Sequence, residues 1–182
     1  MKFEYVYNDM ILKILDESYT LPVLDFLFRN RYDFDKFEPE KPDNFYTEDF
    51  VSSILRAEMT SFLKGNHVRF FQLKKDEPEK ILGTVSFSHI VTGSFNSCDI
   101  GYKIDKDYRR QNLGCSMVSH GIEIMTKEKG MHRIESYIHP DNIPSVMLAK
   151  KMGFIDEGIA HSYVKINGRF QDHLRYAYIH NS

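Results

Sequence analysis

Three consecutive strand-like segments in the middle of the chain, followed directly by one long helical segment, constrain the fold most. Residues 67–73, 81–91 and 96–104 are rich in Phe, Val and Ile, which favour strands. A charged turn separates the first two segments, which predicts a β-hairpin. Residues 113–129 then place apolar side chains at helical spacing, and Gly130 follows where a C-terminal cap belongs. The chain therefore combines a sheet of sequential strands with helices.

The segments on either side of this region complete a pattern of alternating strands and helices. We expect strands at residues 10–15, 133–139, 161–166 and 170–179, helices that begin near Thr20, Thr47 and Asn142, and an ordered loop over residues 32–44. Asn167-Gly168 joins the last two strands and is a strong hairpin signal.

The order β-α-α-β-β-β-α-β-α-β-β predicts an α+β fold. We expect a central, mixed, mostly antiparallel twisted sheet of about six to seven strands, flanked by helices. No repeat or linker divides the sequence, so residues 1–182 are expected to form a single domain.

The composition excludes several classes of protein. Of 182 residues, 42% are hydrophobic and 27% are charged, which argues against extensive disorder. Lys and Arg number 24 against 26 Asp and Glu, so we expect no direct nucleic-acid partner. No apolar run approaches the roughly 20 residues that span a bilayer, and no signal peptide opens the chain. We therefore expect no membrane partner and a cytoplasmic location. The cysteines and histidines lack zinc-site spacing, so no metal is expected.

Residues 104–116 carry the strongest chemical signal. A strand ends, a basic loop follows, and a helix begins within this segment. Backbone N–H groups at a helix start have no helical partner and carry partial positive charge. Asn112 and Gly114 allow the backbone to come close to a ligand, and Arg109 and Arg110 add charge for phosphate contact. These are the features of a pyrophosphate site, although a helix entry with two solvated arginines fits the same spacing.

Two short motifs lie in order along the second half of the chain. Residues 109–114 read Arg-Arg-Gln-Asn-Leu-Gly, and residues 142–145 read Asn-Ile-Pro-Ser, with Met-Gly-Phe behind them at 152–154. The first is similar to the Gln/Arg-x-x-Gly-x-Gly/Ala coenzyme A motif of the GNAT acetyltransferases, except that Asn112 replaces its first glycine. The second resembles that family's next motif.

Further segments narrow the resemblance to the RimJ/RimL group of ribosomal-protein-alanine N-acetyltransferases, and most to its RimJ branch. These segments are residues 91–98, 100–102, 132–134, 158–160 and 167–173. The likeness runs from about Asp9 to Ala177 in the same order and spacing.

The resemblance implies a GNAT fold and an enzyme that transfers acetyl from acetyl-coenzyme A to a primary amine by direct attack in a ternary complex. It implies that the coenzyme is bound by Tyr102, Ile104, Arg109, Arg110, Gln111, Asn112, Leu113, Gly114, Cys115 and Asn142. The backbone of residues 102–104 would bond the pantetheine arm.

The same resemblance points to groups on the helix after Asn142. Asn142 would bond the coenzyme amide, although ordinary helix capping also explains an Asn there. Many family members protonate the departing thiolate with a tyrosine where this chain has Ala149. Ser145 lies one turn earlier on the same face, so we take it as the thiolate partner. A serine that merely begins a helix is the alternative.

The sequence constrains less tightly which side chain would act as the general base that accepts the amine proton. Asp99 lies in the strand beside the expected acetyl site, where other members often place a carboxylate, and a solvated strand carboxylate is the alternative. Glu135 and His139 share one face of the next strand and are weaker candidates. Asp172 and His173 are adjacent in a strand and point to opposite faces, so we expect them to be structural.

Three functions follow. The first, which the resemblance implies, is acetylation of a protein N-terminal α-amine, as in a ribosomal protein. The pKa of such an amine is only about 7.7–8, so little base assistance is needed. The second is the same chemistry on a small amine, such as a polyamine, an antibiotic or an amino-acid derivative. Acidic residues between positions 33 and 43 would suit either acceptor. The third is a non-catalytic coenzyme A-binding module, which Asn112 and the missing tyrosine support.

Overall fold

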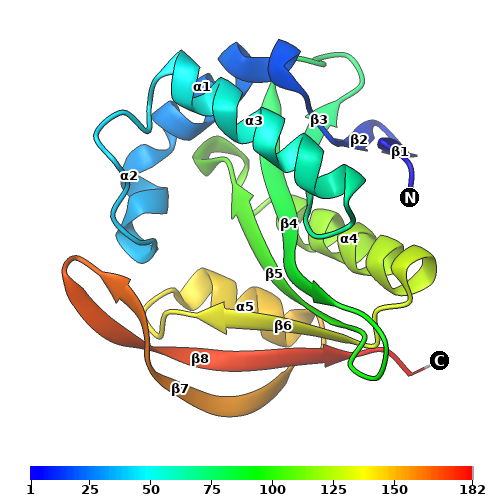
Figure 1. The fold of residues 1–182 in the computed structure, drawn as a ribbon, viewed down its shortest axis with the longest axis vertical. Helices are drawn as coiled ribbons and strands as arrows, with labels where there is room; N and C mark the ends of the chain where they lie inside the picture. Colours follow the sequence, from blue (N-terminus) through cyan, green and yellow to red (C-terminus); the bar gives the residue numbers. More distant parts are fainter. Residues whose placement is uncertain (182) are drawn as a thin grey trace.

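A computed structural model describes residues 1–181, which form one eight-stranded sheet in the order β1-β2-β3-β4-β5-β6-β8-β7 (Figure 1). The strands are β1 (Glu4–Tyr7), β2 (Met10–Lys13), β3 (Val68–Lys74), β4 (Ile81–Val91), β5 (Ser97–Ile104), β6 (Arg133–Ile138), β7 (Ile155–Ile166) and β8 (Arg169–Ile179). Within this part of the chain, neighbouring strands are antiparallel except β5 and β6, which are parallel. The predicted α+β class and mixed, mostly antiparallel sheet are confirmed.

The helices begin close to the predicted positions. They are α1 (Thr20–Arg29), α2 (Arg31–Phe34), α3 (Glu48–Leu63), α4 (Leu113–Lys129) and α5 (Ile143–Lys151), with short 3-10 turns η1 (Glu17–Tyr19), η2 (Asp35–Phe37) and η3 (Lys106–Tyr108). Thr47 caps α3, since its hydroxyl accepts from the N–H of Phe50 at 3.3 Å. Gly130 ends α4 in the left-handed conformation, with a φ of 68°.

The structure also contains elements that the sequence pattern did not indicate. β1 raises the strand number above six to seven; it pairs with β2 across a turn in which Asn8 has a φ of 54°. A strand of four residues is too short to show a period. α2 and η2 lie inside the segment expected to be a loop. β7 begins ahead of the expected residue 161, because two register shifts against β8 interrupt its alternation.

Helices cover both faces of the sheet. Phe70 and Phe71, neighbours on β3, point to opposite sides and enter different cores. Phe70 packs in the core that contains Met117 of α4, whereas Phe71 packs in the core that contains Leu55 of α3. Figure 1 views the sheet from the side of α1 and α3, with α4 behind it.

β5 and β6 separate after a short stretch of pairing. Their parallel register runs from the pair Ser97–Arg133 only to the pair Asp99–Glu135. Beyond it, β5 continues to Ile104 against β4, and β6 continues against β8. In Figure 1 the two strands meet at the lower right and part toward the left. One backbone edge of β5 therefore has no strand partner over its second half.

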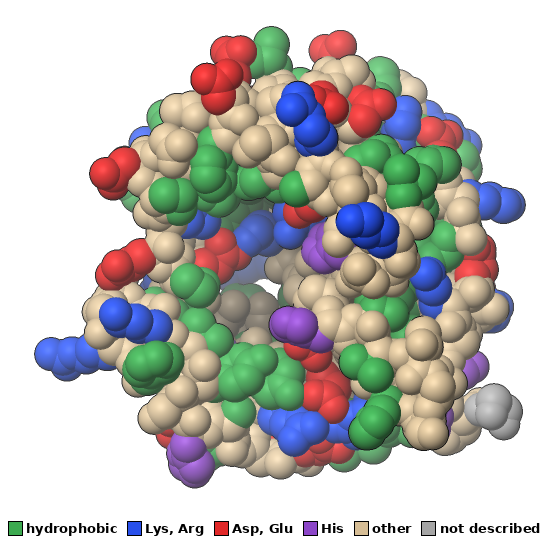
Figure 2. Space-filling view, viewed as in Figure 1, with side chains coloured by type: hydrophobic (Ala, Val, Ile, Leu, Met, Phe, Trp, Pro, Cys, Tyr) green, Lys and Arg blue, Asp and Glu red, His purple; other side chains and the backbone are tan. Residues whose placement is uncertain are grey.

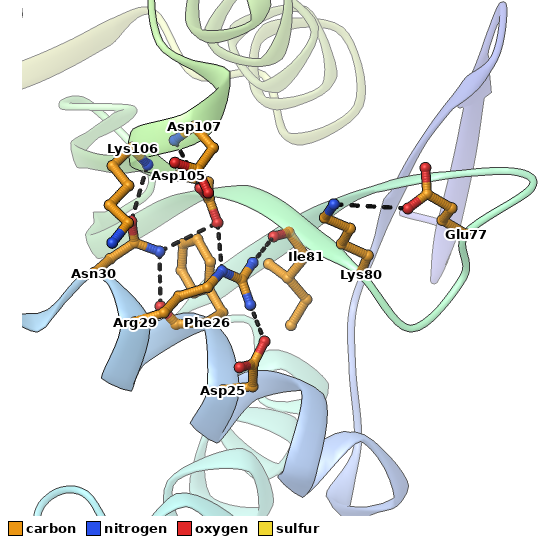
Figure 3. A network of polar contacts seen from close by, with 10 residues as sticks. All are labelled: Asp25, Phe26, Arg29, Asn30, Glu77, Lys80, Ile81, Asp105, Lys106 and Asp107. Carbon is orange, nitrogen blue, oxygen red and sulfur yellow. Dashed lines mark hydrogen bonds and ion pairs between the residues drawn. The ribbon is translucent and has the colours of Figure 1, made fainter.

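Asp105 fastens the end of β5 to α1 (Figure 3). Its carboxylate, 1% exposed, accepts from Arg29 Nε at 2.6 Å, from Asn30 Nδ2 at 3.2 Å and from the N–H of Asp107 at 2.9 Å. Asn30 in turn accepts from the N–H of Lys106 at 2.9 Å. Burial alone would raise the pKa of Asp105, but these donors hold it below its ordinary value. The ionised carboxylate thus fixes where the basic loop begins.

Replacing Asp105 by asparagine should lower the free energy of unfolding by about 2–4 kcal/mol, because Arg29 would lose its buried charge partner. Asp25→Asn is the matched control: Asp25 also pairs with Arg29 but is 69% exposed, so about 1 kcal/mol or less is expected. The pKa of Asp105 is lower in the folded chain than in the unfolded one. The stability that the Asp105 carboxylate contributes is therefore present at neutral pH, and the loss caused by Asp105→Asn should shrink as the pH falls below about 4. Urea unfolding at several pH values measures this, and equal losses in the two variants would contradict it.

Candidate active site

A cleft of about 1270 Å³ opens where β5 and β6 separate. Its walls come from β5, β6, the loop between β5 and α4, the first turns of α4 and α5, and residues 33–38. Figure 2 shows the molecule hollowed beside the α2 region, with basic and acidic side chains inside the hollow and a histidine at its edge. This volume is large enough for a cofactor-sized ligand together with part of a second one.

The start of α4 forms the basic end of the cleft. Ser116 donates the first helical hydrogen bond, to the carbonyl of Asn112 at 3.1 Å. The N–H groups of residues 113–115 therefore precede the helical ladder and can bind a ligand. Arg110 and Asn112 each have a φ of 61°, so the chain turns sharply before the helix. Lys151 of α5 donates to Asn112 Oδ1 at 2.9 Å, which adds another positive charge here.

Gly114 is required for close packing around this end. A Cβ at this position would lie 3.1 Å from Leu148 Cδ1 and 3.3 Å from Ile104 Cγ1. A side chain would therefore push α4 away from both α5 and β5. The free N–H groups, the two arginines and the left-handed turn together fit a coenzyme A diphosphate.

The structure brings most of the predicted coenzyme residues together. The cleft is lined by Tyr102, Ile104, Arg109, Arg110, Asn112, Leu113, Gly114, Cys115 and Asn142. Gln111 is not among the lining residues: its side-chain amide donates to the carbonyl of Asp107 at 3.1 Å and braces the loop instead.

The start of α5 forms the wall opposite β5. Asn142 Oδ1 accepts from the N–H of Ser145 at 3.4 Å, so Asn142 acts as a helix cap in this structure. Ser145 lines the cleft, and its carbonyl accepts from the Tyr102 hydroxyl at 3.1 Å. Burial raises the pKa of Tyr102 to about 12, so this phenol stays protonated and ties β5 to α5. Ala149 is buried in the core, away from the cleft lining.

Asp99 does not line the cleft. It lies where β5 and β6 are still paired, and its Oδ2 is 2.7 Å from His89 Nδ1. Burial raises the pKa of this carboxyl. The structure therefore gives no support to Asp99 as the base, because the strands separate only after this residue. A sequence pattern cannot locate that point of separation.

Sequence reasoning singled out His139, His173 and the acidic residues between positions 33 and 43, but it did not bring them together in one half of the cleft, and it missed the side chains of Lys103 and Phe37. Lys103, Phe37, Glu38, His139 and His173 line this half, on the sheet face turned toward α2. Lys103 forms an ion pair with Glu38, and burial lowers the pKa of Lys103 to about 8. The ring centroids of Phe37 and His139 are 5.3 Å apart. Strand alternation around Tyr102 would have placed Lys103 on this face, but the contact with residues 37 and 38 is a tertiary one.

Comparison with known proteins identifies the family. The sequence profile of the acetyltransferase (GNAT) domain matches residues 14–155, so the chain belongs to the GNAT acetyltransferases. Probable N-acetyltransferase YjcK of Bacillus subtilis (strain 168) is 31% identical over 144 residues, 79% of each chain. The ribosomal protein uS5-alanine N-acetyltransferase of Escherichia coli (strain K12) is 25% identical over 166 residues, which are 91% of this chain and 84% of the relative.

Solved structures agree with this assignment. The ribosomal-protein-S5-alanine acetyltransferase of Vibrio fischeri superposes with a TM-score of 0.90 at 26% identity, over 98% of this chain and 97% of that one. Mycobacterium smegmatis RimJ, solved with CoA-disulfide, has a TM-score of 0.87 at 19% identity, over 93% of this chain and 81% of that one, and shows the shared fold. The chain is thus an enzyme, an N-acetyltransferase of the RimJ/RimL kind that uses acetyl-coenzyme A as co-substrate.

Among residues 1–181, no helix is long and apolar enough to cross a membrane. The same residues contain no group of three or more His, Cys, Asp or Glu side chains placed to hold a metal ion.

Arg110→Gln should weaken coenzyme A binding by about 5- to 10-fold at low salt, because one charged phosphate contact is lost. The loss should shrink as salt is added. Arg169→Gln, at the exposed first residue of β8, removes the same charge away from the cleft and should leave affinity unchanged. Isothermal titration of the folded variants with coenzyme A measures both. Equal affinities for the two variants would contradict the assignment of this loop.

Proposed function

We propose that the chain acetylates the N-terminal α-amine of a protein, a ribosomal protein in the first instance, and that it does so in the cytoplasm. The observation that carries this proposal is that the cleft is lined from both faces of the sheet. Ile104, Gly114 and Ser145 border it on the α4 and α5 side, whereas Phe37 and Lys103 border it on the α2 side. A coenzyme can therefore enter from one face and an amine from the other, as direct transfer requires.

The coenzyme side offers contacts for the diphosphate, the pantetheine arm and the sulfur of acetyl-coenzyme A. The N–H groups of residues 113–115 and the side chain of Arg110 would hold the diphosphate. The unpaired edge of β5 supplies backbone groups for the pantetheine amides. Ser145 would face the departing sulfur, because it begins the helix that forms the other wall of the cleft.

The acceptor side suits the end of a polypeptide. Asp33 and Glu38 line the cleft, where they pair with Arg109 and Lys103, and their negative charge would suit an incoming ammonium group and basic residues behind it. The relatives named as ribosomal protein uS5- or S5-alanine acetyltransferases match nearly the whole length of this chain. The acidic residues suit either acceptor, and the relatives favour a protein N-terminus over a small amine.

Acetyl-coenzyme A turnover should be highest with peptides that begin with Ala or Ser. The assay would follow thiol release against a pool of N-terminal peptides and a separate pool of polyamines and aminoglycosides. The same peptides with an acetylated N-terminus are the matched control and should give no turnover. Turnover confined to the small amines would contradict the proposed acceptor and leave the acetyltransferase chemistry intact.

Ser145→Ala should lower kcat by roughly 10- to 100-fold, because the thiolate would lose its proton donor. The KM for acetyl-coenzyme A and the thermal midpoint should barely change, since Asn142 and not the Ser145 side chain caps α5. Steady-state kinetics with the preferred acceptor would measure this. An unchanged kcat would rule out a role for the Ser145 hydroxyl.

A further inference from the structure

An amine that attacks a thioester must lose a proton, either to water or to a side chain of the cleft. We propose that Nε2 of His173 is the catalytic base that accepts this proton. The inference deepens the proposed function and rests on it, because it assumes an amine acceptor in the α2 half of the cleft.

His173 occupies the right place in the fold. It pairs with Ala160 of β7, and the next residue, Leu174, pairs with Ile138 at the end of β6. His173 therefore lies beside the part of β6 that has already parted from β5. His173 lines the cleft although only 4% of the residue is exposed. Packing against neighbouring side chains therefore fixes the orientation of its ring.

The hydrogen bonds of His173 leave one nitrogen free for chemistry. Nδ1 lies 3.2 Å from the carbonyl of Gln171, which can only accept, so Nδ1 carries the hydrogen. Nε2 then has a lone pair and no hydrogen-bond partner among residues 1–181. A neutral imidazole with its lone pair at a cleft wall is the form that a base needs.

The surroundings keep the ring neutral. Burial lowers the pKa of His173; the hydrogen bond to the Gln171 carbonyl offsets part of this shift, and the nearby ring of His139, which directly follows β6, acts in the same direction as burial. From β7, the ring of Tyr163 faces it at 5.6 Å, and from β8, Arg175 lies two residues further along. The carboxylate of Asp172 opposes the shift only weakly, since it points to the other face.

Three other candidate bases are less suitable than His173. Asp99 lies outside the cleft lining and contacts His89. Although burial would raise the pKa of Glu135, Tyr137 and two arginines bring it to about 2, too low for a useful base. His139 accepts from the N–H of Asp141 at Nδ1 and donates from Nε2 to Gln171 Oε1 at 2.7 Å, so neither nitrogen is free.

The side chains of His173 and Ser145, together with water, account for every proton that moves during acetyl transfer. The amine nitrogen forms a bond to the acetyl carbon, the carbon–sulfur bond breaks, and the amine proton moves to His173 Nε2. The resulting imidazolium keeps its Nδ1–H bond to the Gln171 carbonyl, which favours the charged form. The thiolate takes a proton from the Ser145 hydroxyl, which regains it from water, and His173 releases its proton to water.

The prediction that Asp172 and His173 point to opposite faces is consistent with their contacts. Asp172 accepts from the N–H of Ser162 at 2.8 Å and contacts His161 at 2.9 Å, in keeping with a structural role. His173 lines the cleft instead. The expectation that both are structural therefore fails for His173 on this proposal, because strand alternation cannot show which face becomes the site.

His173→Gln should reduce kcat/KM for the preferred acceptor by about 10²- to 10⁴-fold at pH 7, as expected for removal of a general base. The deficit should be smaller at pH 9, because more of the amine is already neutral there. His161→Gln, on the neighbouring strand and mostly exposed, is the matched control and should leave the rate unchanged. The affinity of both variants for coenzyme A should equal that of the wild type.

The comparison uses whichever acceptor pool the wild-type enzyme turns over, so a wrong acceptor class and a wrong base give different results. A loss below threefold, or a loss that is equal at all pH values, would overturn the assignment of His173. Nitrogen NMR of the histidine-labelled wild-type enzyme provides a test that requires no variant. His173 should be neutral at pH 7 with its hydrogen on Nδ1. An imidazolium, or a ring with its hydrogen on Nε2, at that pH would overturn the assignment of His173 as the base.

Discussion

The structure depends on the early end of the pairing between β5 and β6. Because these parallel strands share only a short register ending at Asp99 and Glu135, their remaining residues diverge and open the cleft. Each strand is followed by a helix, β5 by α4 and β6 by α5, so the divergence also brings both helix starts to the same opening. The unpaired backbone edge, the anion-binding turn and the Ser145 wall are consequences of this single feature of the sheet.

The separated strands need contacts that hold them apart, and the fold provides several. Asp105 anchors the end of β5 to α1 through a buried carboxylate, and the Tyr102 hydroxyl spans the gap to the carbonyl of Ser145. The core that contains Phe70 includes side chains of both β5 and β6, among them Ile100 and Ile134, and so joins the two halves of the sheet. The cleft is therefore built into the packed chain, which suits a site that must position two substrates at once.

The fold and the coenzyme half could be predicted from sequence because their signals are local. Helix starts, the Asn167-Gly168 hairpin and the basic loop before α4 each occupy a few consecutive residues. The acceptor half could not, because it depends on which strands separate and on how residues 31–37 fold over the sheet. Asp99 and His173 illustrate the difference: alternation gives the face of each side chain, but only the tertiary structure shows that the cleft reaches His173 and stops short of Asp99.

A crystal structure with a bisubstrate analogue, an Ala-starting peptide joined through an acetyl bridge to the coenzyme A sulfur, would test the account most directly. The account predicts the diphosphate on the N–H groups of residues 113–115, the sulfur beside Ser145 and the peptide nitrogen within hydrogen-bond reach of His173 Nε2. A peptide that left the cleft on the α4 side, or a nitrogen nearer Asp99 than His173, would contradict it.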